Sequence, residues 1–414
     1  MTDVTDVTDG PDGPDTAALR ESAALIGPEL VALRRSVHRE PEIGLELPLT
    51  QAKVLAALEG LPLEITSGQQ LSSVTAVLRG ALPGPVVLLR ADMDALPVQE
   101  AGGLPYASRF PGVMHACGHD LHVAGLVGAA RLLAERRESL PGSVVFMFQP
   151  GEEGDGGAQR MVDEGVLDAA GAAPVAAYAL HVAAAQLPGG WVATRPGPVM
   201  AAADTLHVTM GGHGGHGSSP HLALDPVPAA CEAVLALQTM VTRRFDAFDP
   251  VVVTVGRFAA GTVENVIPDD AEFSATIRSF SPEARSRVLE EVLRVVRGVG
   301  AAHGLAVDAA VREGYPVTVN DHREAAFAAG TAVALLGADR YVEMPHAVAG
   351  AEDFAVIGAL VPSAYLMLGA CPADRDPFTS PYNHSPEAAY DDAVLPDAAA
   401  LLAALALGRL HRAD

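Results

Sequence analysis

Three short clusters in the sequence combine residue types that can bind a metal ion or transfer a proton. We expect each to lie just past a β-strand, and they read Arg90-Ala-Asp92-Met-Asp94, His115-Ala-Cys117-Gly-His119-Asp120 and Gln149-Pro-Gly-Glu152-Glu153. Two single histidines, His181 and His384, stand in comparable surroundings. Cysteine, histidine and carboxylate together are the ligand set that suits zinc and similar divalent metals. The sequence therefore predicts a metal centre built from these residues.

The spacing within two of the clusters points to metal-assisted hydrolysis. Cys117 and His119 are two residues apart, so they share one side of an extended segment but not of a helix. The adjacent carboxylates Glu152 and Glu153 point apart, so one can bind a metal while the other takes a proton from water. Each residue alone has a simpler explanation, such as a buried thiol or a core histidine. The combination of these residues in neighbouring clusters indicates a metal site.

A second group of histidines lies in the glycine-rich segment 211–221, which contains His213, His216 and His221. Glycine beside a histidine lets the backbone and the imidazole approach a ligand closely. The segment is therefore a candidate for contact with a ligand. The alternative is a histidine-rich turn or an adventitious metal site. The segment follows a predicted strand, and Asp225 and Pro226 are predicted to begin the next helix.

The elements that position the first clusters alternate between strand and helix. Residues 17–60 read as helices interrupted at Pro41, and 122–137 read as a further helix. Apolar runs at 86–90, 143–148 and 175–182 predict strands. This alternation favours an α/β fold with a largely parallel sheet covered on both faces. Ligands of such sheets bind beyond the carboxyl ends of the strands.

The pattern changes after residue 188 and predicts a second, inserted domain. Its strands are expected at 205–210, 251–258 and 271–280, and its helices at 225–241 and 282–303. We predict an α+β domain over residues 199–311. It would interrupt a catalytic domain made of 17–198 and 312–414, which ends in a helix over 396–409. Residues 1–16 are predicted to be a disordered tail.

Composition excludes several classes of partner. The 414 residues include 51 acidic and 27 basic ones, for a formal net charge of −24, which disfavours nucleic acid or an anionic membrane as partner. Three cysteines are too few for a disulfide framework and favour a reducing cytoplasm. We find neither a secretory signal nor an apolar run long enough to span a membrane, and expect a cytoplasmic protein.

Taken in order, eight segments resemble the amidohydrolase branch of the aminoacylase/carboxypeptidase metallopeptidases. That branch includes hippurate hydrolase, N-acyl-amino acid deacylases and indole-acetyl-amino acid hydrolases, and the resemblance covers roughly residues 28–410. The segments are Arg34-Arg35-x-x-His38-x-x-Pro41-Glu42, Arg90-Ala-Asp-Met-Asp-Ala-Leu-Pro97, His115-Ala-Cys-Gly-His-Asp120, Gln149-Pro-x-Glu-Glu153, Gly215-His216…Pro220-His221, Asn265-x-Ile-Pro268, Gly350-Ala-Glu-Asp-Phe354 and Asn383-His-Ser-Pro386.

The resemblance implies a phosphorylase/hydrolase-like catalytic domain with a dinuclear metal site. Glu152 matches the general base, and Asp94 matches an aspartate that orients a ligand histidine. Asp92 stands where the peptidase branches carry a metal-binding histidine. Two divalent ions are expected, manganese or zinc first and cobalt or nickel as alternatives. The residues that match ligand positions are Cys117, His119, Glu153, His181 and His384.

The same resemblance implies that the inserted domain is a ferredoxin-like lid and dimerisation domain. His216 matches a histidine that stabilises the tetrahedral oxyanion, often from the partner subunit, and Asn265 is a candidate to join it. Arg278 is the candidate for the substrate carboxylate, with a surface arginine as the alternative. A homodimer is expected, and a tetramer is the alternative.

The predicted activity is hydrolysis of N-acyl-amino acids, such as hippurate or N-acetyl- and aryl-acetyl-amino acids, to a carboxylate and an amino acid. A metallo-dipeptidase, a carboxypeptidase or an N-acetyl-diaminopimelate deacetylase are alternatives on the same scaffold. A different chemistry is a cysteine hydrolase with Cys117 as nucleophile, which a chelator would leave active. A different class altogether is a metal-binding protein without catalytic activity.

Overall fold

The computed structural model describes residues 15–412, and these fall into two compact units. Among the described residues, the first unit comprises 15–197, 319–345 and 356–412, and the second comprises Pro198–Thr318 and His346–Ala355. Most of the predicted tail, residues 1–14, lies outside the described residues. Helix α1 (Thr16–Arg39) begins directly after it, and the Asp15 side chain caps α1 by accepting a hydrogen bond from the Ala18 N–H at 3.0 Å.

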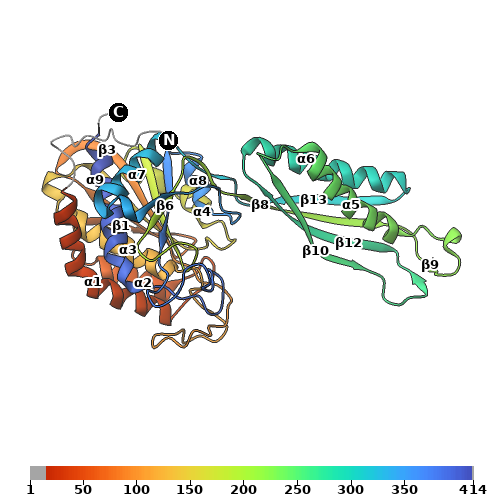
Figure 1. Cartoon of the computed structure of the whole chain (residues 1–414), viewed down its shortest axis with the longest axis horizontal. Coiled ribbons are helices and arrows are strands. Elements are labelled where there is room, and N and C mark those ends of the chain that lie inside the picture. Colours follow the sequence, from red (N-terminus) through yellow and green to blue (C-terminus); the bar gives the residue numbers. More distant parts are fainter. Residues whose placement is uncertain (1–14, 413–414) are drawn as a thin grey trace. The chain divides into compact units, whose positions relative to one another are not determined.

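The first unit is built on an eight-stranded sheet in the order β1-β2-β4-β3-β5-β16-β6-β15 (Figure 1). The central strands β4, β3, β5 and β16 run parallel to one another, and β15 runs parallel to β6. The pairs β1–β2, β2–β4 and β6–β16 are antiparallel. The predicted, mostly parallel sheet is thereby confirmed. The strands are β1 (Leu63–Ser67), β2 (Val74–Arg79), β3 (Leu82–Asp92), β4 (Pro141–Gln149), β5 (Ala176–Ala183), β6 (Val192–Thr194), β15 (Tyr341–Glu343) and β16 (Ser363–Gly369).

Helices α3 and α9 pack against each other and against β3, and α1 packs on both helices (Figure 1). Small side chains allow this close approach, since a Cβ at Gly128 of α3 would lie 2.6 Å from that of Ala399 on α9. Besides α1, the helices of this unit, with α8 at its boundary, are α2 (Pro48–Leu58), α3 (His119–Ala134), η1 (Arg137–Ser139), α4 (Gly157–Asp163), η2 (Val166–Asp168), α7 (His322–Leu336), η4 (Ala338–Arg340), α8 (Phe354–Gly358), η5 (Asp392–Val394) and α9 (Leu395–Leu410).

The C-terminal helix is longer than the predicted 396–409, and the expectation that no apolar run is long enough to span a membrane is wrong for this segment. The turn η5 extends it to Asp392–Leu410, 19 residues that could cross a membrane by length and composition alone. That segment is 78% buried inside the structure, which is the behaviour of a core helix. It forms much of the hydrophobic core with β3, β5 and α3.

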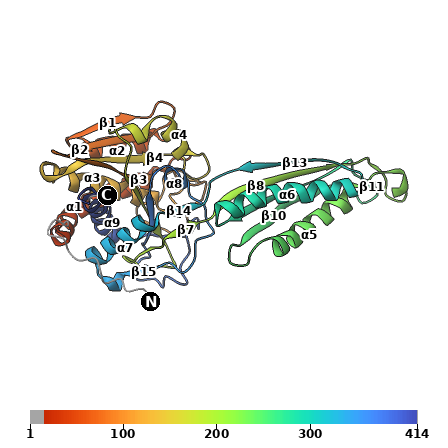
Figure 2. The same ribbon diagram turned by 90° about the horizontal axis from the view of Figure 1, so that it is seen from above.

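The second unit is a four-stranded antiparallel sheet in the order β10-β12-β8-β13, with α5 and α6 side by side along it (Figure 2). This order is that of a ferredoxin-like fold, as predicted. The fourth strand, β13, is an addition to the elements expected from the sequence. The elements are β8 (Ala202–Gly211), β9 (Gly215–His216), η3 (Pro220–Leu222), α5 (Pro226–Arg244), β10 (Val251–Ala260), β11 (Val266–Ile267), β12 (Asp270–Ser279), α6 (Pro282–Ala302) and β13 (Ala306–Glu313).

Alternation of side chains builds the core of the second unit. On β12, Phe273, Ala275 and Ile277 are buried, while the residues between them are partly exposed. Two further short strands, β7 (Gly197–Met200) and β14 (Thr318–Asn320), mark the points where the chain passes from one unit to the other.

Candidate metal centre

Four neighbouring parallel strands deliver the chemically active clusters to one edge of the first sheet. Strand β3 ends at Asp92, β4 ends at Gln149, and β5 carries His181 near its end. His384 lies in the loop after β16, the strand paired with β5. Because the carboxyl ends of these strands meet at one edge, residues far apart in the sequence converge there.

Two groups of possible metal ligands share the thiol of Cys117. In each group the ligand atoms lie within 4.8 Å of one another, and the two groups are Cys117, His119, His181 and Cys117, Glu153, His384. The Nε2 atoms of His181 and His384 lie 3.4 and 3.2 Å from the Cys117 Sγ. The Glu153 Oε1 lies 3.3 Å from the His384 Nε2. The structure therefore brings together all five side chains expected as ligands.

The orientation of the imidazoles fits metal binding. His181 Nδ1 donates a hydrogen bond to the Val182 carbonyl at 2.9 Å, so its Nε2 faces Cys117 as an acceptor. Both ring nitrogens of His119 are buried and form no hydrogen bond with any residue the structure describes. Buried polar atoms are normally paired, and a divalent cation would satisfy one of these nitrogens. The donor set of thiolate, imidazole and carboxylate fits zinc or a similar metal.

Two of these histidines have strongly shifted pKa values. Hydrogen bonds with Cys117 and Glu153 raise the pKa of His384 to about 10. Burial, assisted by the neighbouring His122, lowers the pKa of His181 well below its usual range. A metal-ligating histidine must be neutral, so metal binding at His384 has to displace a proton. Metal affinity should therefore fall as the pH decreases.

The backbone at two positions serves this arrangement. Gly118, between Cys117 and His119, has φ +82°, and a Cβ there would lie 2.4 Å from the Val182 side chain. Only glycine fits, because both the conformation and the space exclude a side chain. His384 has φ +71°, a conformation that costs a non-glycine residue free energy and is common at functional sites. Its N–H donates to the Ala116 carbonyl at 2.8 Å, which ties the loop after β16 to the Cys117 segment.

Asp94 and Glu152 lie beside the ligands. Asp94 accepts a hydrogen bond from the Glu153 N–H at 3.0 Å, and its other oxygen lies 3.5 Å from the His119 Nδ1. One carboxylate thus faces both a candidate imidazole ligand and the backbone of a candidate carboxylate ligand. Glu152 is buried, and its carboxylate lies within 4.8 Å of the ligand atoms of His119 and Glu153. These positions suit an orienting group and a proton-transfer group respectively.

Comparison with known proteins identifies the family. Residues 88–408 match peptidase family M20/M25/M40. The chain belongs to this family. It is 37% identical over 345 residues to N-acetylcysteine deacetylase of Bacillus subtilis, covering 82% of this chain and 88% of the relative. It is 36% identical over 344 residues to thermostable carboxypeptidase 2 of Saccharolobus solfataricus, covering 82% of this chain and 85% of that one.

A solved crystal structure supports the same family assignment. The crystal structure of the YXEP protein of Bacillus subtilis, described as a dinuclear metal binding peptidase from the M20 family, matches with a TM-score of 0.80 and 33% identity. The match covers 94% of this chain and 99% of that one. The predicted family and fold class are confirmed. The chain therefore belongs to a family of hydrolases that act on amide bonds, which confirms the predicted enzyme class.

Within this M20-family catalytic unit, Asn383 is a polar residue to which the sequence assigned no role. Its Nδ2 donates to the Val182 carbonyl at 3.0 Å and lies 3.4 Å from the Cys117 carbonyl. Its Oδ1 accepts from the Ala184 N–H at 2.9 Å. Asn383 thus joins the end of β5 to the loop that carries His384. Its place in the matching segment Asn383-His-Ser-Pro386, next to a candidate ligand, was the signal in the sequence.

A buried charge network behind the centre was also missed. Arg34 of α1 is fully buried, and its guanidinium donates to Asp120 at 2.7 Å and to Asp392 at 2.7 Å. His38 Nδ1 lies 2.9 Å from Asp120, the residue that follows His119. The spacing of Arg34 and His38, one helical turn apart on a helix with an apolar face, is the available signal.

The second unit of this M20-family chain does not bring its three candidates together. His216 on β9 pairs with Val266 on β11, and the Gly217 N–H donates to the Asn265 carbonyl at 2.8 Å, so His216 and Asn265 are neighbours. Arg278 lies at the other end of β12, eight residues after Asp270. At a rise of about 3.3 Å per residue, roughly 25 Å separates the two ends of that strand.

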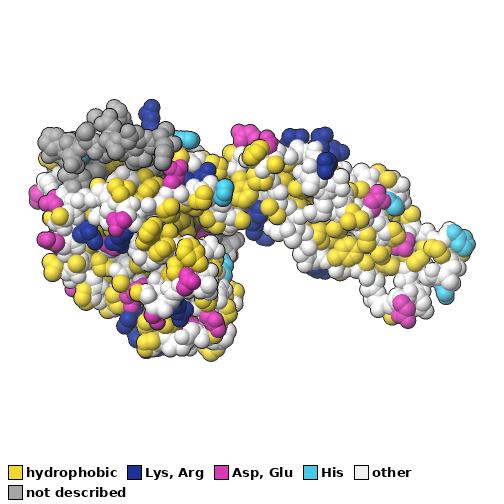
Figure 3. Space-filling model, in the orientation of Figure 1, with side chains coloured by type: hydrophobic (Ala, Val, Ile, Leu, Met, Phe, Trp, Pro, Cys, Tyr) yellow, Lys and Arg dark blue, Asp and Glu magenta, His cyan; other side chains and the backbone are white. Residues whose placement is uncertain are grey.

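The His216 end of the second unit is rich in exposed histidines. His213, His216 and His221 are all exposed. Figure 3 shows histidine side chains in cyan at this end, where Figure 1 labels β9. Arg278 is half-buried, and burial lowers the pKa of its guanidinium. His216 and Asn265 are therefore open to an approaching surface, whereas Arg278 is partly enclosed.

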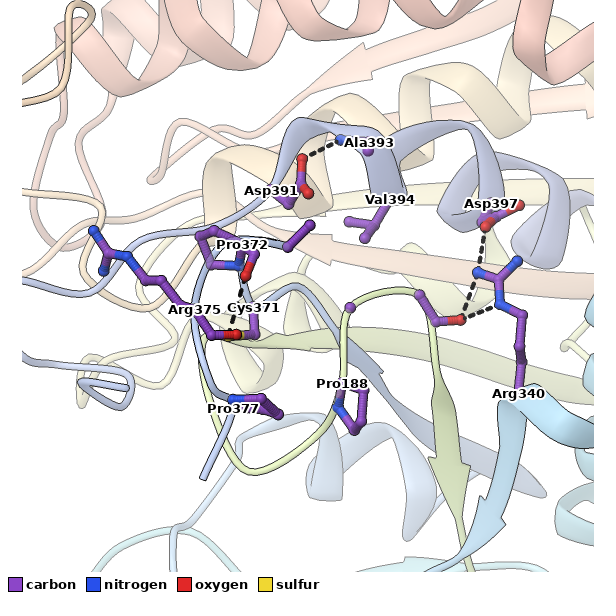
Figure 4. A pocket seen from close by; sticks show the side chains of 13 residues that line it. Pro188, Arg340, Cys371, Pro372, Arg375, Pro377, Asp391, Ala393, Val394 and Asp397 are labelled. Atoms are coloured by element: carbon purple, nitrogen blue, oxygen red, sulfur yellow. Dashed lines mark hydrogen bonds and ion pairs between the residues drawn. The ribbon is translucent and has the colours of Figure 1, made fainter. Parts of the chain in front are cut away.

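A cavity of about 310 Å³ lies elsewhere in the first unit (Figure 4). Its wall includes Cys371 and Arg340, and the Arg340 guanidinium donates to Asp397 and to the Gly190 carbonyl, both at 2.6 Å. The cavity contains none of the candidate ligands or proton-transfer groups. Arg340 and Asp397 in its wall pair with each other, and we assign the cavity no part in the chemistry of the metal centre.

Proposed function

We propose that this chain is a metal-dependent amidohydrolase that cleaves N-acyl-amino acids into a carboxylate and an amino acid. The observation that carries the proposal is the pair of ligand groups sharing Cys117, with the Glu152 carboxylate beside them. Identity of 37% to a deacetylase of an N-acyl-amino acid supports the same substrate class. Two divalent ions, manganese or zinc, would be held by Cys117, His119, Glu153, His181 and His384.

The residues of the metal centre have distinct roles in the proposed reaction. Bound divalent ions supply Lewis acidity toward the amide carbonyl and lower the pKa of water. Glu152 takes the proton from the attacking water and passes it to the leaving amine nitrogen. Asp94 holds the His119 ring in the orientation that presents Nε2 to the ligand cluster, as expected for a carboxylate behind a ligand histidine.

Two residues of the second unit would stabilise charge on the substrate. His216 and Asn265 donate to the oxyanion of the tetrahedral intermediate, and Arg278 binds the substrate carboxylate. Since roughly 25 Å of strand separates these two groups in one rigid sheet, one chain cannot bring both to the same centre. We therefore assign His216 and Asn265 to the site of a second copy in a homodimer.

The outer strand β10 supports such a dimer. It lies at the edge of its sheet, and Val252 and Phe258 on it expose 45% and 42% of their surface. Unpaired sheet edges with exposed apolar residues are ready to pair with another chain. A second copy would cover this edge. A stable and fully active monomer in gel filtration would contradict the role of His216 in a second subunit.

A peptidase is the second candidate, favoured by 36% identity to a carboxypeptidase. The test is amine release from hippurate, N-acetyl-amino acids, indole-acetyl-amino acids and plain dipeptides. The protein would be stripped with chelator and assayed with and without manganese, zinc or cobalt. Metal-dependent cleavage of acylated substrates alone supports the amidohydrolase, and cleavage mainly of dipeptides supports the peptidase. Activity that survives stripping would favour Cys117 as a nucleophile.

Replacing Glu152 by glutamine tests the proposed base. Glu152→Gln should lower turnover about 10²–10⁴-fold, because glutamine cannot accept the proton, while both metal ions still bind. Glu138→Gln, at an exposed surface carboxylate, serves as the control and should change neither quantity. Near-normal turnover in Glu152→Gln would remove Glu152 from this role.

The proposed compartment is the cytoplasm. All three cysteines of the structure are free, and Cys117 must stay reduced to serve as a metal ligand. A reducing environment preserves that state. No nucleic-acid or membrane partner is proposed.

A further inference from the structure

His122 contacts both imidazoles of the first ligand group. It lies three residues after His119 on α3, so the two side chains share one face of the helix. The His122 ring stacks on the His119 ring with centroids 5.3 Å apart and an interplanar angle of 28°. It meets the His181 ring edge-on at 4.8 Å. No other imidazole among the described residues touches both rings at these distances.

Both nitrogens of His122 are already used. Its Nε2 accepts a hydrogen bond from the Val182 N–H at 2.8 Å, so Nε2 carries no proton. Its Nδ1 therefore carries the proton and donates to Asp92 Oδ1 in a short hydrogen bond. Val182 follows His181, whose own Nδ1 donates to the Val182 carbonyl. His122 and His181 thus hold opposite sides of one residue at the end of β5.

The partner of His122 is fixed by an independent ion pair. Asp92 is fully buried, and its second oxygen accepts from Arg90 Nη1 at 2.6 Å. The Arg90 Nε in turn donates to Gln149 Oε1 at 2.9 Å, at the end of β4. Asp92 is therefore neutralised by an arginine and anchored to two strands.

By distance alone, Asp92, His119 and His122 could hold a metal, since their ligand atoms lie within 4.8 Å of one another. The hydrogen bonds decide against it, because a histidine ligand needs a free lone pair and His122 has none. We propose that Asp92 and His122 form a positioning pair that orients His119 and His181, and that His122 binds no metal. This inference rests on the proposed function of the metal centre.

The test uses His122→Phe in the full chain. Phenylalanine keeps a ring against His119 and His181 but removes both hydrogen bonds. Cobalt is the probe, with stoichiometry and dissociation constants from chelator competition and the visible spectrum of the loaded protein. His207→Phe, at an exposed histidine in the second unit, is the matched control.

A positioning role predicts that His122→Phe still binds two equivalents of cobalt, with affinity lowered about 10–100-fold and a shifted visible spectrum. The kcat should fall by a similar factor while KM changes less than about threefold. Loss of one equivalent would make His122 a ligand and overturn the proposal. Two equivalents with unchanged affinity and spectrum would also overturn it.

Asp92→Asn provides a second variant if His122→Phe fails to fold. Its amide oxygen can still accept from His122 Nδ1, but the charge facing Arg90 is lost. It should also retain two equivalents with weakened affinity, and the same two outcomes would contradict the proposal. The unmutated protein separates this test from the proposed function. If it binds fewer than two equivalents, the dinuclear assignment fails whatever the variants do.

Discussion

The candidate metal centre and the His216 end of the second unit carry similar residue types in opposite surroundings. Asp94, His119 and Cys117 are buried, and hydrogen bonds from several strands and loops hold the residues around them. His216 and Asn265 are exposed, and among the described residues the His216 ring forms hydrogen bonds only with the nearby Ser218.

The contrast in burial separates two tasks, metal binding in the first unit and contact with the substrate in the second. A buried cluster built by one unit can bind metal without help, because its ligands are ordered before the metal arrives. Exposed polar residues on a two-stranded ribbon have no such enclosure, and act on a substrate only where another surface covers them. We therefore expect changes at the candidate ligands of the first unit to affect both metal binding and activity. Changes at the candidate substrate-binding residues of the second unit should affect activity and leave metal binding unchanged.

The strongest test of this division is Cys117→Ala. Both ligand groups use this thiol, so its loss should release both metal ions and lower activity at least about 10⁴-fold. Metal content by elemental analysis and amine release measure the two effects. Cys371→Ser, at a buried thiol outside the ligand groups, should keep its metal. If Cys117→Ala retains two equivalents of metal, the two ligand groups do not depend on the shared Cys117 thiol.

His216→Ala should lower turnover about 10²–10³-fold, the effect of removing one oxyanion donor, with metal content unchanged. Amine release measures the turnover, and elemental analysis measures the metal content. Loss of metal in this variant would erase the distinction between the two regions.

Mixed dimers sharpen that result. Each homodimer of Glu152→Gln or His216→Ala has defective sites. Co-expression of the two variants creates a mixed dimer in which one site has Glu152 from its own chain and His216 from the partner copy. Activity should then return. A mixture as inactive as its parents would place His216 and Glu152 of one site on the same chain.

Arg278→Ala should raise KM about 10–100-fold with little change in kcat, because a charge-assisted hydrogen bond to the substrate carboxylate contributes roughly 1.5–3 kcal/mol. Substrates with an esterified carboxyl group should show no such change. Arg294→Ala, at an exposed arginine on α6 that pairs with Glu291, is the control. Equal KM values for Arg278→Ala and the unmutated protein would make Arg278 a surface arginine.

The sequence predicted the parts of the centre that follow strands, because apolar runs mark the strand ends where ligands converge. Cys117, Glu152 and His181 became candidates in this way. Asn383 and His122 were assigned no role, since their contacts reach backbone groups of β5 and a charge on β3, and no local pattern encodes a partner 60 or 201 residues away.

Strand β13 was missed for a related reason. Only one of its eight residues, Ala309, is buried, so it lacks the alternating apolar pattern of β12. Its place is set by antiparallel pairing with β8. An exposed edge strand is specified by backbone pairing and not by hydrophobic periodicity.

The smallest effect is expected from the charge network behind the centre. Burial alone would lower the pKa of His38, but Asp120 and Glu100 raise it to about 8. The folded pKa exceeds the unfolded value of about 6.5, so His38 contributes stability below pH 6.5 and loses it as the pH rises through 8. A shift of this size corresponds to about 2 kcal/mol.

His38→Gln should therefore lower the thermal midpoint at pH 6 and lower it less at pH 9, while metal stoichiometry stays at two. Thermal scans of both proteins at the two pH values measure the difference. Equal losses at pH 6 and pH 9 would mean that packing of the His38 ring, not its charge, stabilises the first unit. A loss of metal would show that the network is part of the centre and would extend the buried region beyond the ligands themselves.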